Sequence, residues 1–330
     1  MTPTLPVSAY LDASVHRAEQ AGLFKRTWLV AAASAAVRNP GDVVAVTVAG
    51  APVIVVRGED GVLRAFHNAC RHRFGPLVWD GERDCVKQLR CRYHGWRYGL
   101  DGALVAAPGF GEAVDDRGLV PVACAAWRGL VFVAFDPDGP LEAALGGLPE
   151  AAAAVPFESF EIVHEARHAL ACNWKTYVEN YLEGWHIPFL HPALVADIDV
   201  SAYEVHAGDT FCTHHAPPRD GSPSDGFWAW LWPNTAINVY RGGMSLERIL
   251  PTGPDTMEIA YTYLFAKDVP QAERERAMGA SLTLTHEDRQ VCEAVQHGMA
   301  SRAFETGLVS PRHEQGLARF YALWRAAVPS

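Results

Sequence analysis

The sequence predicts an α+β protein of two domains, in which a β-domain precedes a domain that combines strands with a long helix. Its 330 residues exceed the length at which a single hydrophobic core usually stops growing. Short apolar runs separated by turn residues dominate from Asp42 to Phe135. Alternating strands from Tyr203 to Ala266 are followed by a helical pattern from about Pro270 to Met299.

Local patterns place the boundaries of these segments. The predicted organisation is an N-terminal helical segment over residues 1–40 that packs with the second domain, the β-domain over 41–148 and the second domain over 149–330. The β-domain strands are expected at residues 43–48, 52–56, 62–66 and 127–135, with a Gly-Glu-Asp-Gly hairpin turn at 58–61. The Ala-, Gly- and Leu-rich segment 140–156 contains the domain boundary, and a last amphipathic helix is expected over 311–328.

Composition excludes several classes of function. The chain has 28 basic and 38 acidic residues, and its net charge of −10 argues against a nucleic-acid or anionic-membrane partner. It has no apolar run long enough to span a bilayer, and its first residues do not resemble a signal peptide. Seven scattered cysteines are not a disulfide framework. We therefore expect a cytoplasmic, reduced protein in which any paired cysteines hold metal.

Two Cys-His units lie inside the predicted β-domain. Cys70 and His72 form a C-x-H unit, and Cys91 and His94 form a C-x-x-H unit. Four such ligands suit tetrahedral zinc or a Rieske [2Fe-2S] cluster, which is held by two thiolates on one iron and two imidazoles on the other. The C-x-H unit is tighter than the usual zinc spacing, which favours the Rieske cluster.

A second pair of histidines, His186 and His191, lies five residues apart with Pro188 between them. A continuous helix would place them on different faces. Proline disfavours a helical residue before it, so we expect a helix to stop near His186 and the chain to turn. With one carboxylate, two imidazoles brought together in this way form the facial triad of non-haem Fe(II) oxygenases.

The residues that flank the Cys-His units identify a family. The segments Phe66–Ala69 and Gly95–Gly102 resemble the Rieske domain of Rieske non-haem iron oxygenases, the ring-hydroxylating α-subunit family. The resemblance covers nearly the whole chain. It implies an all-β Rieske domain and a helix-grip catalytic domain with an antiparallel sheet. It also implies a [2Fe-2S] cluster on the four Cys and His ligands.

The same resemblance assigns the mononuclear iron. The iron histidines of the family fall on His186 and His191. The third ligand is an Asp that follows another acid and precedes a Gln by eight positions, a pattern matched by Glu287, Asp288 and Gln296. Asp288 is therefore the expected ligand, and Glu287 is the alternative.

Two further residues acquire roles from the resemblance. Asn180 falls where the family often keeps an Asn near the iron. Glu183 stands where many members carry an Asp that links a histidine of the iron site to the second Rieske histidine of a neighbouring subunit, here His94. This implies a homotrimer or a multiple of it. Glu at this position is the form associated with choline monooxygenase-like and carnitine, betaine and stachydrine oxygenases.

The activity implied is that of a terminal oxygenase. Electrons would come from a separate NAD(P)H-dependent reductase of the flavin or ferredoxin type, because the chain has no nicotinamide motif. The iron would use O2 to hydroxylate or N-demethylate a small substrate, possibly a quaternary ammonium compound. Two alternatives remain open. They are the α-subunit of an aromatic-ring dioxygenase and a Rieske electron-transfer protein without oxygenase activity.

A row of tryptophans allows two interpretations. Trp228, Trp230 and Trp232 alternate along a predicted strand and share one face. Such a row is more often part of a sheet-to-helix core than of an aromatic cage for a quaternary ammonium group.

Overall fold

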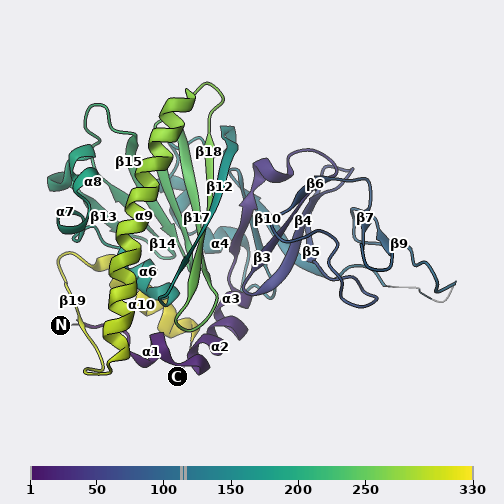
Figure 1. The fold of residues 1–330 in the computed structure, drawn as a ribbon, viewed down its shortest axis with the longest axis horizontal. Helices are drawn as coiled ribbons and strands as arrows, with labels where there is room; N and C mark the ends of the chain where they lie inside the picture. The colour runs from purple at the N-terminus through teal and green to yellow at the C-terminus, as the bar shows by residue number, and fades with distance from the viewer. Residues whose placement is uncertain (1, 112–113, 115–116, 329–330) are drawn as a thin grey trace. The chain divides into compact units, whose positions relative to one another are not determined.

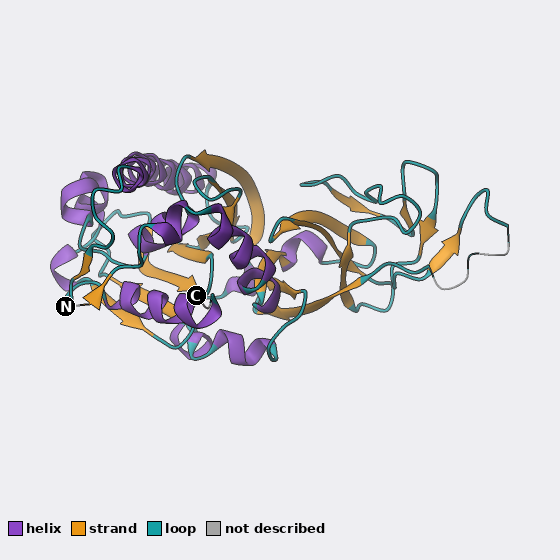
Figure 2. Ribbon diagram, turned by 90° about the horizontal axis from the view of Figure 1, so that it is seen from below, coloured by secondary structure: helices purple, strands orange, loops and turns teal. Residues whose placement is uncertain are grey.

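The computed structural model describes residues 2–111, 114 and 117–328, and the chain divides into two compact units (Figure 1). Residues 25–141 form the first unit, called here the β-unit. Residues 1–24 and 142–330 form the second, called the helix–sheet unit. Figure 2 shows that the helices are concentrated in the helix–sheet unit. The predicted α+β class with an all-β first part is confirmed.

The β-unit contains two antiparallel sheets. The larger runs in the order β2 (Leu29–Ala33), β11 (Leu130–Ala134), β10 (Pro121–Trp127), β5 (Leu63–His67), β4 (Ala51–Arg57), β3 (Asp42–Val48) and β6 (Arg83–Cys85). The smaller consists of β7 (Leu89–Arg90), β8 (Arg97–Tyr98) and β9 (Leu104–Ala106). Alternate residues of β3 and β4, such as Val43 and Ile54, pack in one core with Cys70, Cys91 and Trp96. The two cysteines are therefore held by a rigid core.

The structure divides the chain at residue 25, whereas the sequence placed a boundary after residue 40. The difference arises at β2, whose five residues are all buried and which pairs with β11. An apolar segment of this kind extends the sheet of the β-unit. The preceding residues form the short helices α1 (Ser8–Leu11), α2 (Ala13–Ala21) and α3 (Leu23–Arg26).

The helix–sheet unit is built on a seven-stranded antiparallel sheet. Its order is β12 (Glu161–Leu170), β18 (Met257–Phe265), β17 (Gly243–Pro251), β16 (Thr235–Tyr240), β15 (Ser224–Leu231), β14 (Phe211–His215) and β13 (Glu204–Ala207). The long helix α9 (Gln271–Ala300) crosses this sheet (Figure 1). Two hydrogen bonds attach α9 to β18, one between the hydroxyls of Tyr261 and Thr285 at 2.8 Å and one between those of Tyr263 and Ser281 at 3.0 Å.

Short elements complete this unit. They are β1 (Thr2–Pro3), which pairs with β19 (Leu308–Val309), and the helices α4 (Leu141–Leu145), α5 (Leu148–Ala151), α6 (Trp174–Tyr181), α7 (Ile187–Leu190), α8 (Pro192–Asp197) and α10 (Gln315–Ala327). In the described part of this unit, 3-10 turns lie at Phe157–Ser159 and Val200–Ala202, and another, in the β-unit, lies at Ser34–Val37. Among the described residues, no helix combines the length and the apolar character needed to cross a membrane.

Helix α6 is fixed at its N-terminus by Asn173. The Asn173 side chain accepts a hydrogen bond from the Lys175 amide at 3.0 Å, which is a helix N-cap. Its own backbone N–H donates to Gln296 Oε1 of α9 at 2.9 Å. Residue 296 was singled out in the sequence as part of the family pattern, and here it ties α9 to the start of α6.

A buried ion pair joins α2 to α6. The Lys175 ammonium lies 2.6 Å from Glu19 Oε1, and both side chains are fully buried. The indole N–H groups of Trp174 and Trp324 donate to the same carboxylate at 2.9 and 2.7 Å. Burial lowers the pKa of Lys175, while the charge of Glu19 opposes that effect. The hydrogen bonds from the two indoles add to the contact with Lys175, so the Glu19 carboxylate is held by three donors.

We predict that Glu19→Gln destabilises the helix–sheet unit by roughly 3–5 kcal/mol, because it removes the carboxylate that pairs with a buried ammonium. Urea unfolding followed by tryptophan fluorescence would measure the loss. Arg289→Ala is the control, since it breaks an exposed ion pair with Glu293 on α9 and should cost about 0.5 kcal/mol or less. A Glu19→Gln effect as small as that of the control would contradict a structural role for the pair.

Candidate active site and iron–sulfur centre

Two loops of equal length hold the predicted cluster ligands in the β-unit. The Cys70 N–H donates to Gly75 O at 2.8 Å, and the Cys91 N–H donates to Trp96 O at 2.9 Å. The residue four positions after each cysteine donates its backbone N–H to the carbonyl of that cysteine. Phe74 does so to Cys70 at 2.9 Å, and Gly95 does so to Cys91 at 3.0 Å. Both of these residues have positive φ, 58° and 75°. The two ligand units therefore have the same backbone design.

The donor set at these loops fits a Rieske cluster. Cys70 and Cys91 are buried free thiols, and His72 and His94 lie with ring centroids 4.5 Å apart. His72 Nδ1 is buried without a hydrogen-bond partner, as expected of a nitrogen reserved for a metal. A Cβ at Gly75 would lie 3.3 Å from Cys91 Sγ, so glycine leaves room beside that sulfur.

Tyr98 is a residue of this centre that the sequence analysis missed. Its hydroxyl oxygen accepts from the Arg71 N–H at 3.0 Å and lies 3.2 Å from Cys70 Sγ. It can therefore donate to the Cys70 thiolate, and hydrogen bonds to cluster sulfurs tune the reduction potential. Its place seven residues after Cys91 carried no separate signal, because a tyrosine in a short strand is ordinary core.

The segment that carries His186 and His191 differs locally from expectation. Helix α6 ends at Tyr181, five residues before His186, and Pro188 lies in the first turn of the separate helix α7. Proline suits the first turn because that position needs no N–H donor. Proline therefore starts a helix here instead of ending one. The predicted result, two imidazoles brought together, is nevertheless present.

A glycine permits the turn between α6 and α7. A Cβ at Gly184 would lie 2.2 Å from Cε1 of Tyr203, so only glycine lets the backbone pass this ring. Glu183 closes the same turn, since its Oε2 accepts from the backbone N–H groups of Trp185 at 2.5 Å and His186 at 3.1 Å.

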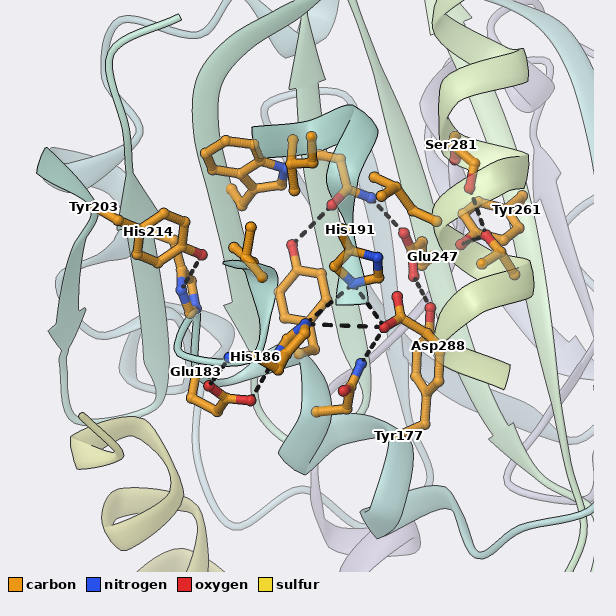
Figure 3. A pocket seen from close by; sticks show the side chains of 18 of the residues that line it. Tyr177, Glu183, His186, His191, Tyr203, His214, Glu247, Tyr261, Ser281 and Asp288 are labelled. Atoms are coloured by element: carbon orange, nitrogen blue, oxygen red, sulfur yellow. Dashed lines mark hydrogen bonds and ion pairs between the residues drawn. The ribbon is translucent and has the colours of Figure 1, made fainter. Parts of the chain in front are cut away.

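The structure brings His186, His191 and Asp288 together (Figure 3). One ligand atom from each lies within 4.8 Å of the others. The two Nε2 atoms are 3.2 Å apart, and Asp288 Oδ1 lies 3.0 Å from that of His191 and 3.9 Å from that of His186. Two nitrogens and one carboxylate oxygen that converge in this way fit a 2-His-1-carboxylate iron site.

Two further carboxylates, those of Glu183 and Glu287, contact the triad histidines on the ring nitrogens that face away from the triad. Glu183 Oε1 lies 2.5 Å from Nδ1 of His186, and Glu287 Oε2 lies 2.7 Å from Nδ1 of His191. Each carboxylate thus fixes the ring and leaves Nε2 free for a metal. Glu287, the alternative third ligand, contacts the nitrogen turned away from the triad, which favours Asp288. Asn180 donates to Asp288 Oδ1 at 2.7 Å and orients that carboxylate.

A pocket of about 100 Å³ opens beside the triad. Six aromatic side chains line it: Tyr177, Tyr181, Tyr203, Trp228, Tyr240 and Tyr261. His214 also lines it, and burial lowers its pKa to about 3, so its imidazole is neutral. His214 Nδ1 lies 3.0 Å from the hydroxyl of Tyr203 (Figure 3). Of the tryptophan row, only Trp228 lines the pocket. Trp230 and Trp232 pack against Phe320 of α10 as core.

Glu247 on β17 is a second residue that the sequence analysis missed. It lines the pocket although its side chain is only 3% exposed. Tyr177 donates to its Oε2 at 3.2 Å, and Asn238 donates to its Oε1. A charged residue within a strand that is otherwise buried on both faces was the only sequence signal for it.

Comparisons with known proteins agree with this geometry. Residues 157–330 match the family "Ring hydroxylating alpha subunit (catalytic domain)", and residues 27–123 match "Rieske [2Fe-2S] domain". The carnitine monooxygenase oxygenase subunit of Escherichia coli strain K12 is 30% identical over 350 residues, which cover 97% of this chain and 92% of that protein. The chloroplastic choline monooxygenase of Beta vulgaris is 26% identical over 339 residues, which cover 96% and 75%.

Among solved structures, a quaternary ammonium Rieske monooxygenase in complex with an inhibitor superposes with a TM-score of 0.90. It is 25% identical, and the match covers 99% of this chain and 96% of that one. The matched domains imply a Rieske cluster and a mononuclear iron that uses O2, with the reductase-supplied electrons typical of the family. The chain belongs to the Rieske non-haem iron oxygenases, in the ring-hydroxylating α-subunit family.

Proposed function

We propose that this oxygenase hydroxylates or N-demethylates a small quaternary ammonium compound. The observation that carries the proposal is the chemistry of the pocket. Carboxylates and aromatic faces line it, and its described lining residues include no Lys or Arg. Aromatic faces attract ammonium groups, and a pocket without basic residues gives an anionic aromatic acid no partner. The relatives named for choline and carnitine act on compounds of the proposed kind.

Within this proposal, His186, His191 and Asp288 hold Fe(II). When bound, the iron supplies open positions for O2 beside the substrate. Glu183 and Glu287 keep each imidazole in the tautomer that presents Nε2, and Asn180 holds the Asp288 carboxylate in place. The aromatic walls exclude water from the substrate. Hydroxylation of a carbon attached to nitrogen gives an unstable product that loses the oxidised carbon, which is N-demethylation.

Cys70, Cys91, His72 and His94 hold the Rieske cluster, which supplies one electron at a time. We infer that a separate NAD(P)H-dependent reductase of the flavin or ferredoxin type feeds it. The cytoplasmic location expected from composition belongs to the same proposal. The three segments expected from the sequence, residues 1–40, 41–148 and 149–330, belong to it as well, with β2 moved from the first segment to the second because it pairs with β11.

We also propose that the enzyme is a homotrimer or a multiple of it, in which the iron site of one subunit receives electrons from the cluster of the next. A ring of head-to-tail contacts is the closed symmetry that such packing requires. Glu183, which already holds His186, would reach His94 of the partner subunit. The bond from Glu183 to His186 supports the first half of this bridge.

The first test concerns the metal ligands. We expect the wild-type protein to contain about three irons per chain, two in the cluster and one in the triad. Asp288→Ala should lose roughly one iron and all product formation while it keeps the Rieske absorbance. Glu287→Ala, the matched control, should retain most of the third iron. Loss of iron in Glu287→Ala alone would transfer the ligand role to Glu287, and about two irons in the wild type would favour a simple electron carrier.

A second test concerns the substrate class. With a reductase present, quaternary amines without a carboxylate, such as choline, should stimulate O2 uptake at least tenfold over the substrate-free rate. Aromatic acids should not, because a carboxylate finds no basic group in the pocket. Formaldehyde release would report N-demethylation. Stimulation by aromatic compounds alone would refute the quaternary ammonium proposal and support an aromatic-ring dioxygenase.

The third test concerns the bridge. Glu183→Gln keeps the volume of the side chain but removes the charge that holds the two imidazoles. The variant should remain oligomeric and keep both metal centres, and its reduced cluster should be oxidised at least tenfold more slowly in a single turnover with substrate and O2. Glu287→Gln makes the same change at the other imidazole and should slow this step less. An unchanged single-turnover rate in Glu183→Gln, or a monomer that turns over normally, would show that the bridge is wrong.

A further inference from the structure

The pocket beside the triad contains a buried carboxylate without a cationic partner. Glu247 points into the pocket from β17, on the side of Asp288 and Tyr177 (Figure 3). Its described hydrogen-bond donors, Tyr177 and the amide of Asn238, are neutral. No described Lys or Arg forms an ion pair with it. Charged side chains are almost never fully buried unless they are paired, so Glu247 needs an explanation.

The surrounding groups hold this carboxylate in one orientation. The Asn238 amide nitrogen donates both to Glu247 and to Ser245 Oγ, the latter at 2.9 Å, while the amide oxygen accepts from the hydroxyl of Tyr181 at 3.1 Å. The amide therefore cannot flip without losing its partners. A network of this kind fixes the position of a negative charge at the wall of the pocket.

The same environment makes the ionised form costly when the pocket contains no cation. The pKa of Glu247 is raised to about 7, chiefly by burial and also by the charge of Asp288, although hydrogen bonds from Asn238, Tyr177 and Tyr261 oppose the shift. A positive charge placed beside this carboxylate would compensate the cost of burying it. A neutral ligand of the same shape would not.

The walls around Glu247 suit an ammonium group that carries methyl groups. Tyr177, Tyr261 and Tyr240 are buried aromatic side chains of the same pocket, and Trp228 lines it from β15, two strands away from β17 in the same sheet. Methylated ammonium groups have few or no N–H donors, so they bind through charge and aromatic faces instead of hydrogen bonds. In such a site the carboxylate supplies the opposite charge, and the aromatic faces contact the methyl groups.

We propose that Glu247 is the counter-ion of the substrate's ammonium group and that it determines the preference of this enzyme for cations. The proposal rests on the proposed function, because it concerns the substrate of the same pocket. The proposal adds Glu247 to the residues that touch the substrate. It implies that the pocket selects its substrate by positive charge and not by shape.

The experiment compares two ligands of one shape on the oligomeric enzyme with both metals loaded. One is choline, and the other is its neutral isostere, in which a quaternary carbon replaces the nitrogen. Calorimetry without O2 measures binding and does not depend on turnover. The wild type should bind choline at least tenfold more tightly than the isostere. Glu247→Gln should weaken choline binding by about 10- to 100-fold and change binding of the isostere by less than about threefold.

Two further variants separate charge from folding. Glu247→Asp keeps the charge and should retain a preference for choline even if both ligands bind more weakly. Glu179→Gln is the matched control, because the pKa of Glu179 on α6 is also raised by burial to about 7, yet Glu179 is not among the described residues that line the pocket. It should leave the ratio of the two affinities unchanged.

The outcomes distinguish this inference from the function on which it rests. A wild type that prefers choline together with a Glu247→Gln variant that keeps the full preference would overturn the role of Glu247 and leave the quaternary ammonium proposal intact. A wild type that binds the isostere as tightly as choline would overturn both. Loss of the preference in Glu247→Gln, with its retention in Glu247→Asp and Glu179→Gln, supports the inference.

Discussion

Two hydrogen bonds between α6 and α9 hold the active site together. The Asn173 backbone N–H donates to Gln296 Oε1 at 2.9 Å, and Asn180 Nδ2 donates to Asp288 Oδ1 at 2.7 Å. The partners on each helix are separated by about two turns, and they pair in opposite order along the chain. The helices are therefore locked antiparallel in a single register. Because the two histidines follow α6 directly and Asp288 lies on α9, this register sets the distance between the nitrogens and the carboxylate.

The site concentrates negative charge, and the fold stabilises each carboxylate differently. Glu183 and Glu287 face imidazole nitrogens, and Asp288 accepts from Asn180. Glu247 has only neutral donors, and its pKa is raised by burial to about 7. Carboxylates gathered in this way repel one another unless cations join them. An Fe(II) ion at the triad and the proposed ammonium group at Glu247 are two cations that would relieve this repulsion.

The sequence alone predicted those site residues that occur close together at a characteristic spacing. The C-x-H and C-x-x-H units and the pair His186 and His191 could be found because ligand residues cluster along the chain. The α+β class followed from the change in hydrophobic pattern. Asp288 lies about a hundred positions from its partners, and only the family resemblance selected it.

The remaining features depend on contacts that no local pattern contains. Strand β2 belongs to the β-unit because of its pairing with β11, which is formed across about a hundred residues of chain. Pro188 starts α7 because α6 had already ended at Tyr181, and a proline alone does not say on which side its helix lies. In the sequence, Glu247 is an ordinary acidic residue of a strand, and only the folded sheet shows that its side chain lines the pocket. Tyr98 likewise acquires a role only when its hydroxyl reaches Cys70.

The two histidines of the triad are not equivalent, and the difference bears on how electrons enter. The His191 side chain is 3% exposed and is held by Glu287 of α9, whereas the His186 side chain is 22% exposed and is held by Glu183 of its own turn. The buried imidazole is fixed from two elements and serves as the rigid part of the site. His186 is the more exposed imidazole of the pair, and Glu183 fixes its Nδ1 from the same turn. If electrons arrive from another subunit, as proposed above, the Glu183–His186 side would receive them, while Glu287 and Asn180 hold His191 and Asp288 in place.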